Sequence, residues 1–166
     1  MVLWGEGEKP FLSLAEYFMG ERNIEEVYNL TYRGEKGICK NEMCVPASLD
    51  EVPFVYEDLS GFDNKIIYYE TQRGCPYNCQ FCLSSVEKGV HFLSEERVIS
   101  DLQHFIDNRV KQVKFVDRTF NCNPKRAAEI LTFIKEEYGK KIPGDVCFHF
   151  EIAADILTRE LFDVIS

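Results

Sequence analysis

The sequence predicts an α/β fold: a short helix and a β-hairpin, followed by the first half of a (β/α) barrel. Residues 65–166 alternate between segments typical of strands and segments with a helical apolar stripe. Because a helix follows each strand, neighbouring strands need crossover connections and form a parallel sheet. The chain stops as the third helix begins, so we expect half of a barrel rather than a closed one.

Composition indicates one globular domain. The chain has 166 residues, of which 45% are hydrophobic and 28% charged, which excludes a disordered polymer. Its formal net charge of −9 disfavours nucleic acid as a partner, since phosphates are repelled. No apolar run approaches the roughly 18 residues of a membrane span, and the first residues do not resemble a signal peptide. We therefore expect a cytoplasmic protein with no membrane partner.

Residues 1–64 are predicted to precede the barrel as a linking segment. A capping box at residues 13–16 opens a short helix, which Gly20 is expected to end. Residues 29–41 predict a β-hairpin around a Gly-Glu-Lys-Gly turn. Residues 46–64 form an irregular connector that packs through its aromatic side chains, Phe54, Tyr56 and Phe62.

The barrel half, residues 65–166, is predicted from three strands and three helices. The expected strands are residues 65–70, 112–117 and 146–153. Ser94, Asn123 and Thr158 are N-caps of the helices, and Gly139 is expected to end the second one.

The third strand has a clear alternation. Phe148 and Phe150 fall on one face, and His149 and Glu151 fall on the other. We expect the phenylalanines to pack under helices and the polar pair to point into the barrel. Interior polar groups need partners, so the pair either meets a bound cofactor or forms a satisfied core contact.

Three of the seven cysteines are clustered directly after the first barrel strand. Cys75, Cys79 and Cys82 follow the pattern C-x3-C-x2-C, with Gly74 before them to allow a sharp turn. Ligands of parallel α/β folds gather at the carboxyl ends of strands. Three thiolates can hold three irons of a four-iron cluster and leave the fourth open to a substrate's amino and carboxylate groups.

Other interpretations of the cysteines stay open. Zinc prefers paired C-x2-C units and a fourth ligand, and an electron-transfer cluster needs a fourth cysteine. The four scattered cysteines are expected to be bystander thiols, although Cys122 follows the second strand and so lies on the active face. They are Cys39, Cys44, Cys122 and Cys147.

The cysteine motif, with Phe81 in C-x3-C-x-Phe-C, resembles the signature of the radical S-adenosylmethionine (SAM) superfamily. The resemblance implies a partial (β/α)6 TIM-like barrel, a [4Fe–4S] cluster, SAM, an external electron donor and a small-molecule substrate. In that family one electron cleaves SAM to a 5′-deoxyadenosyl radical. The text from Tyr68 to Cys79 and from Phe115 to Asn121 resembles the branch with a cobalamin-binding domain ahead of the barrel. That branch includes B12-dependent methylases and anaerobic magnesium-protoporphyrin ester cyclases.

The resemblance also implies cofactor contacts. Phe81 would lie near the adenine, and Asp117 and Arg118 would meet the amine and carboxylate of SAM. Asp117 and Arg118 would otherwise stabilise a loop. His149 and Glu151 are the remaining candidates for a cofactor contact.

The predicted function is therefore that of a fragment of a radical SAM enzyme, of oxidoreductase or methyltransferase type. It would bind the cluster and SAM for methyl transfer or oxidative cyclisation, with cobalamin held by an absent upstream domain. The alternatives are a methylthiotransferase and a non-enzymatic zinc-binding module. Half a barrel leaves an open sheet edge, through which self-association is expected.

Overall fold

The computed structural model describes residues 1–44, 48–85, 89–141 and 146–165. Its contacts divide the chain into two compact units, Met1–Ala47 and Ser48–Ser166. The connector after residue 47 therefore groups with the barrel half and not with the helix and hairpin that precede it.

The first unit is a three-stranded antiparallel sheet with one helix. The strand order is β1-β2-β3, and β2 pairs with β3 as the predicted hairpin. Its small core consists of Val27, Leu30 and Tyr32. The bounds are β1 Val2–Leu3, α1 Glu8–Met19, the 3-10 helix η1 Ile24–Glu26, β2 Leu30–Gly34 and β3 Gly37–Lys40.

Helix α1 begins earlier than the capping box at residues 13–16 predicts. It starts at Glu8, and Pro10 is tolerated because the N–H groups of the first turn have no partner within a helix. Ser13 lies inside the helix, where its hydroxyl donates to the Pro10 carbonyl and accepts from the Tyr28 amide. The helix ends at Gly20, with φ of 79°, as predicted.

The second unit contains the parallel sheet. Its strands are β4 Ile66–Tyr69, β5 Gln72–Cys75, β6 Gly89–Phe92, β7 Gln112–Phe115 and β8 Cys147–His149. Its α-helices are α2 Glu95–Asp107, α3 Pro124–Lys141 and α4 Arg159–Ile165. Four short 3-10 helices connect them among the described residues: η2 Leu49–Glu51, η3 Leu83–Ser85, η4 Phe120–Cys122 and η5 Ala154–Ile156.

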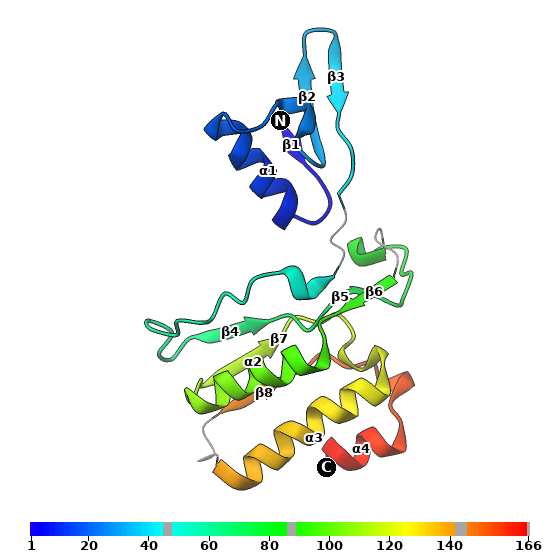
Figure 1. The fold of residues 1–166 in the computed structure, drawn as a ribbon. Helices are drawn as coiled ribbons and strands as arrows, with labels where there is room; N and C mark the ends of the chain where they lie inside the picture. Colours follow the sequence, from blue (N-terminus) through cyan, green and yellow to red (C-terminus); the bar gives the residue numbers. More distant parts are fainter. Residues whose placement is uncertain (45–47, 86–88, 142–145, 166) are drawn as a thin grey trace. The chain divides into compact units, whose positions relative to one another are not determined.

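Strands β4, β7 and β8 form the predicted parallel sheet, in that order. Figure 1 shows α2 and α3 on one side of this sheet, with α4 beside α3. The strands place Tyr68, Lys114 and His149 in one row of the other face, where Tyr68 and His149 are exposed. Helices on one face and an open second face are the arrangement expected of an unclosed barrel.

The core of the second unit lies between the sheet and its helices. Ile67, Val113 and Phe115 from the strands contact the apolar side of α2 and α3, where Val98, Leu102, Phe105 and Ile130 are buried. The connector packs against this core through Phe54, Tyr56 and Phe62, as predicted.

Further predicted boundaries are wrong, among them the end of the second strand, which the sequence predicts at Asp117 and which lies at Phe115. Strand β8 ends at His149, although the sequence predicts a strand to Ala153. In the register of the two strands Lys114 pairs with His149, and the neighbour β7 ends one residue later at Phe115, so the chain from Glu151 onward has no β7 residue to pair with. Helix α3 continues through Gly139 to Lys141, because a glycine inside a helix costs only about 1 kcal/mol.

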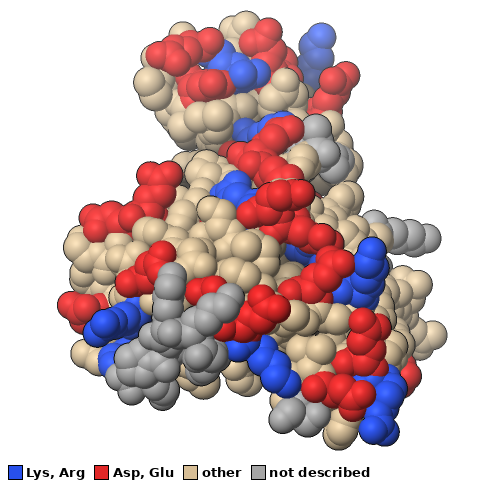
Figure 2. Space-filling view, turned by 60° about the horizontal axis from the view of Figure 1, so that its bottom comes forward, with Lys and Arg blue, Asp and Glu red and all other residues tan. Residues whose placement is uncertain are grey.

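An apolar pocket of about 470 Å³ lies between α3, α4 and β8, the strand at the edge of the parallel sheet. Its lining includes the side chains of Phe148, Phe150 and Val164. Self-association through this open edge stays a prediction. In the view of Figure 2, acidic side chains are spread over the surface between scattered basic ones, in keeping with the net charge. No helix among the described residues is long and apolar enough to cross a membrane.

Candidate functional site

The three clustered cysteines lie on a hairpin that the sequence did not predict. Strands β5 and β6 pair antiparallel, and Cys75 at the end of β5 faces Gly89. Cys79 and Cys82 lie in the loop between these strands, joined by a hydrogen bond of 3.0 Å from the Cys82 amide to the Cys79 carbonyl. All three lie outside disulfides; Cys79 is exposed, and Cys75 and Cys82 are half-buried.

Gly74 allows the two strands of this hairpin to approach closely. Its φ of +98° is unfavourable for residues with a side chain, and a Cβ atom there would lie 2.2 Å from the Gly89 carbonyl oxygen. The predicted need for glycine next to the first cysteine is therefore a steric need of the hairpin. The close approach at Gly74 thereby fixes the position of Cys75, the last residue of β5.

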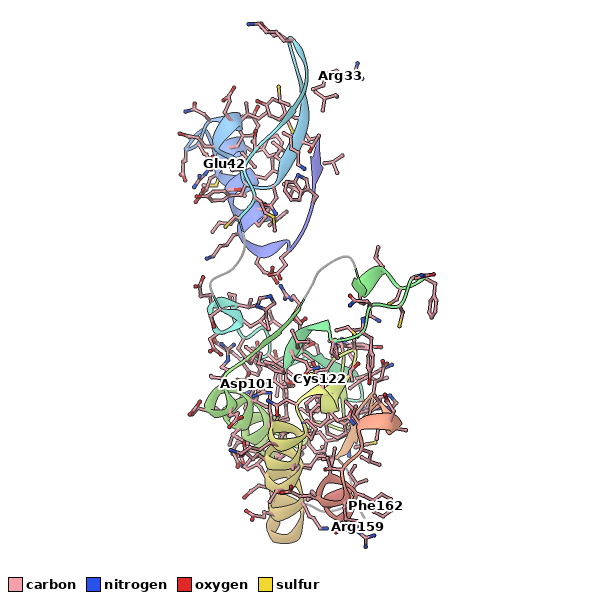
Figure 3. The ribbon with its side chains drawn as sticks, turned by 90° about the vertical axis from the view of Figure 1, so that its right-hand side faces the viewer. Arg33, Glu42, Asp101, Cys122, Arg159 and Phe162 are labelled. Carbon is pink, nitrogen blue, oxygen red and sulfur yellow. The ribbon has the colours of Figure 1, made fainter. Side chains whose placement is uncertain are left out.

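Cys75 lies at the carboxyl end of the parallel sheet, as expected. Its Sγ is 3.6 Å from the hydroxyl of Thr119, in the segment that follows β7. Gln72 binds the same segment, because its amide nitrogen donates to the Thr119 carbonyl at 2.7 Å. Cys122, labelled in Figure 3, comes from η4 below the hairpin, and its thiol contacts the Gln72 amide oxygen at 3.5 Å.

Asp117 connects the end of β7 to the start of β5. The carboxylate is fully buried and accepts hydrogen bonds from the Thr71 amide at 2.8 Å, the Thr71 hydroxyl at 2.5 Å and the Gln72 amide at 3.1 Å. Burial raises the pKa of Asp117 to about 6, and the hydrogen bonds from Thr71 oppose that rise. These contacts give Asp117 the loop-stabilising role, and its contact with SAM stays a prediction.

A second set of contacts connects the cysteine loop to the chain after β8. The buried Asn121 side chain donates to the Ala153 carbonyl and accepts from the Ala153 amide, both at 2.8 Å. Two residues further on, Asp155 accepts from the hydroxyl of Tyr77 at 3.1 Å. Tyr77 lies between the first two cysteines, so Asn121 indirectly stabilises the middle of the loop.

The electrostatic surroundings of the thiols differ. Hydrogen bonds from Ser84 lower the pKa of Cys82, and the positive charge of Arg118 adds to this effect. Burial raises the pKa of Cys122, which favours its neutral thiol. A thiolate is the form that binds iron, so the surroundings favour Cys82 over Cys122 as a ligand.

The donor set fits an iron–sulfur cluster. Three cysteines outside disulfides, on a hairpin that contains a conformationally permissive glycine, can surround three irons. Among the residues that the structure describes, no three His, Cys, Asp or Glu side chains already form a metal site. The loop would therefore have to draw its three sulfurs together as a cluster binds, which couples binding to local folding.

The other predicted contact residues remain accessible. Phe81 is 94% exposed on the cysteine loop, and Arg118 is exposed beside it. His149 and Glu151 are exposed, while Phe148 and Phe150 pack against the core, which agrees with the predicted alternation. No ligand contact is tested for any of them, so their cofactor roles stay predictions.

Sequence reasoning missed three residues of the site. Gln72, Thr119 and Tyr77 connect the cysteine hairpin to the segments that follow β7 and β8, yet each is a common polar or aromatic residue type. The available signal was position: Gln72 and Tyr77 flank the first cysteine, and Thr119 follows the second strand. Arg73, two residues before Cys75, forms an ion pair of 2.7 Å with Glu70.

Residues 69–166 match the sequence model of the Radical SAM superfamily. An uncharacterized methyltransferase of Pyrococcus horikoshii is 36% identical in an alignment of 148 residues that covers 82% of this chain and 32% of the relative. The chain thus spans about a third of the length of that relative.

Two solved structures share the fold. The cobalamin-dependent SAM radical enzyme OxsB, with aqua-cobalamin and SAM bound, aligns with a TM-score of 0.72 and 22% identity, over 96% of this chain and 25% of its own. The radical SAM methyltransferase TsrM of Kitasatospora setae, with cobalamin and a [4Fe–4S] cluster bound, aligns with a TM-score of 0.73 and 16% identity, over 98% of this chain and 35% of its own. At these identities the likeness concerns the fold.

Proposed function

Because the chain belongs to the radical SAM superfamily, as its cysteine motif predicts, we propose that it holds a [4Fe–4S] cluster through Cys75, Cys79 and Cys82. The cluster and SAM are the cofactors of this family. The observation that carries the proposal is the position of three cysteines, none of them in a disulfide, on a hairpin at the carboxyl end of a parallel sheet.

We assign complementary roles to the residues around the thiols. Gly74 sets the turn out of β5, and Asp117 fixes the start of that strand through Thr71 and Gln72. Exposed Phe81 offers an aromatic face for an adenine ring, and Arg118 offers a cation for a carboxylate. When bound, the cluster supplies one electron for the reductive cleavage of SAM.

Methyl transfer is the reaction that the relatives favour. The Pyrococcus horikoshii relative is named a methyltransferase, and TsrM is a radical SAM methyltransferase. We propose methyl transfer to a small molecule over oxidative cyclisation for that reason. Cobalamin enters this proposal through OxsB and TsrM alone, and no residue of the chain is assigned to it.

Anaerobic reconstitution with iron and sulfide tests the cluster assignment. We expect about four iron atoms and four sulfides per chain, with the visible absorbance of a cluster. Cys75→Ala should lose most of the iron, while Cys147→Ala should keep it. Cys147 is a matched control because it is an exposed cysteine at the opposite end of the sheet, paired with Gln112 at the start of β7.

Two results would overturn the proposal. One is stoichiometric zinc without iron or sulfide after anaerobic purification and iron supply, which would favour a zinc-binding module. The other is equal iron loss in Cys75→Ala and Cys147→Ala. Incubation of the reduced protein with SAM adds a second measurement, 5′-deoxyadenosine. We expect little of it, because the inner face of the sheet is open to water around Tyr68 and His149.

A further inference from the structure

Thr119 brings a hydroxyl to the first cysteine of the cluster motif. Its Oγ1 lies 3.6 Å from Cys75 Sγ, and the residue is only 4% exposed. A distance of this length is a normal hydrogen bond to sulfur, which is larger than oxygen. Because Thr119 is buried, water competes little for its hydroxyl.

The hydroxyl is held in place by the backbone of its own residue. The Thr119 carbonyl accepts from the Gln72 side chain at 2.7 Å and from the Cys122 amide at 2.9 Å. Gln72 is itself 2% exposed and donates its amide to Asp117. The position of Thr119 relative to β5, and so to Cys75, is therefore fixed from both sides of the contact.

The direction of the hydrogen bond follows from the chemistry of the ligand. A free thiol can donate or accept, but a cysteine that binds iron is a thiolate and can only accept. Thr119 must then be the donor. Hydrogen bonds to cluster sulfurs stabilise the more negative, reduced cluster and are one of the factors that set reduction potentials.

We propose that the Thr119 hydroxyl donates to the Cys75 thiolate and raises the reduction potential of the bound cluster. Thr119 is thus a positioning and tuning residue that acts through Cys75. This inference rests on the proposed function, since it requires a cluster on the three cysteines.

Thr119→Val removes the hydroxyl and keeps the shape of the side chain, and Thr119→Ser keeps the hydroxyl. A single hydrogen bond is worth a factor of about five in an equilibrium. At 59 mV per tenfold change for one electron, we expect the midpoint potential of Thr119→Val to be ~40 mV more negative than that of the wild type. Thr119→Ser should restore most of the difference. Thr132→Val, on the exposed side of α3, is the matched control and should leave the potential unchanged.

The measurement is a potentiometric titration of the reconstituted full chain, followed by electron paramagnetic resonance of the reduced cluster. Iron and sulfide content are determined first in every variant. A wild type that takes up no cluster overturns the proposed function. A Thr119→Val protein that holds a full cluster at the wild-type potential overturns this inference alone. An equal shift or equal cluster loss in Thr119→Ser also overturns it, because packing and not the hydroxyl would then be responsible.

Discussion

The buried carboxyl of Asp117 offers a quantitative test of the structure through the substitution Asp117→Asn. Asp117 is fully buried at the end of β7 and binds the backbone of Thr71 and Gln72, the first residues on the way to the cysteine hairpin. Asparagine keeps the shape and one acceptor oxygen but cannot ionise. The comparison therefore isolates the free energy of ionising one buried group.

The size and sign of the effect follow from the pKa. Burial raises the pKa of Asp117 from 3.8 to about 6. Between these two pH values the carboxyl group is therefore protonated in the folded chain and ionised in the unfolded chain. The stability that this proton provides is fully present below about pH 4 and is lost as the pH rises through about 6. A pKa difference of about 2, at about 1.36 kcal/mol for each pH unit, corresponds to ~3 kcal/mol.

Urea unfolding of both proteins at pH 4, 5, 6 and 7.5 gives the free energy of unfolding at each pH. At each pH, the free energy of unfolding of Asp117→Asn is subtracted from that of the wild type, which cancels the contributions of the other carboxyl groups. This difference should fall by ~3 kcal/mol from pH 4 to pH 7.5. Asp63→Asn, at an exposed position, serves as the control substitution. A difference for Asp117→Asn that stays flat, or that grows with pH, would refute the assigned burial and its sign.

Two further substitutions test the geometry of the loop by urea unfolding and iron uptake. Gly74→Ala places a Cβ 2.2 Å from the Gly89 carbonyl oxygen at a φ of +98°. Gly37→Ala is the control, since Gly37 has a φ of +125° but open space around it, and it should lower the free energy of unfolding by about 1–3 kcal/mol. Gly74→Ala should lower it by more, and an equal loss would contradict the close approach of the two strands. Asn121→Ala removes both hydrogen bonds to Ala153. It should lower the free energy of unfolding by about 2–4 kcal/mol. A loss below about 0.5 kcal/mol would show that these hydrogen bonds do not form in solution.

Local signals in the sequence predicted much of the fold. The caps at Ser94 and Thr158 are present, since their hydroxyls accept amide hydrogen bonds in the first turns of α2 and α4. The β-hairpin of the first unit and the three parallel strands also follow the prediction. Such features depend on neighbours within a few residues, and a single sequence carries that information.

The errors arose where partners distant in sequence decide the structure. The predicted capping box at residues 13–16 lies inside α1, where Ser13 accepts from Tyr28. The predicted third strand does not reach Ala153, because β7 ends at Phe115 and offers no pairing partner from Glu151 onward. The hairpin of β5 and β6 was missed because its pairing is set by two glycines, Gly74 and Gly89, and not by an alternating pattern.

The sequence by itself predicted the family of this protein and the three cysteines that are proposed to carry its chemistry. The spacing of Cys75, Cys79 and Cys82 indicates an iron–sulfur loop and a radical SAM family, because ligand type and spacing are properties of a short segment. Only the tertiary structure decided what surrounds those sulfurs. Thr119 and Asp117 reach the hairpin across more than forty positions of the chain, and contacts of that range depend on how the sheet is packed, which no local pattern records.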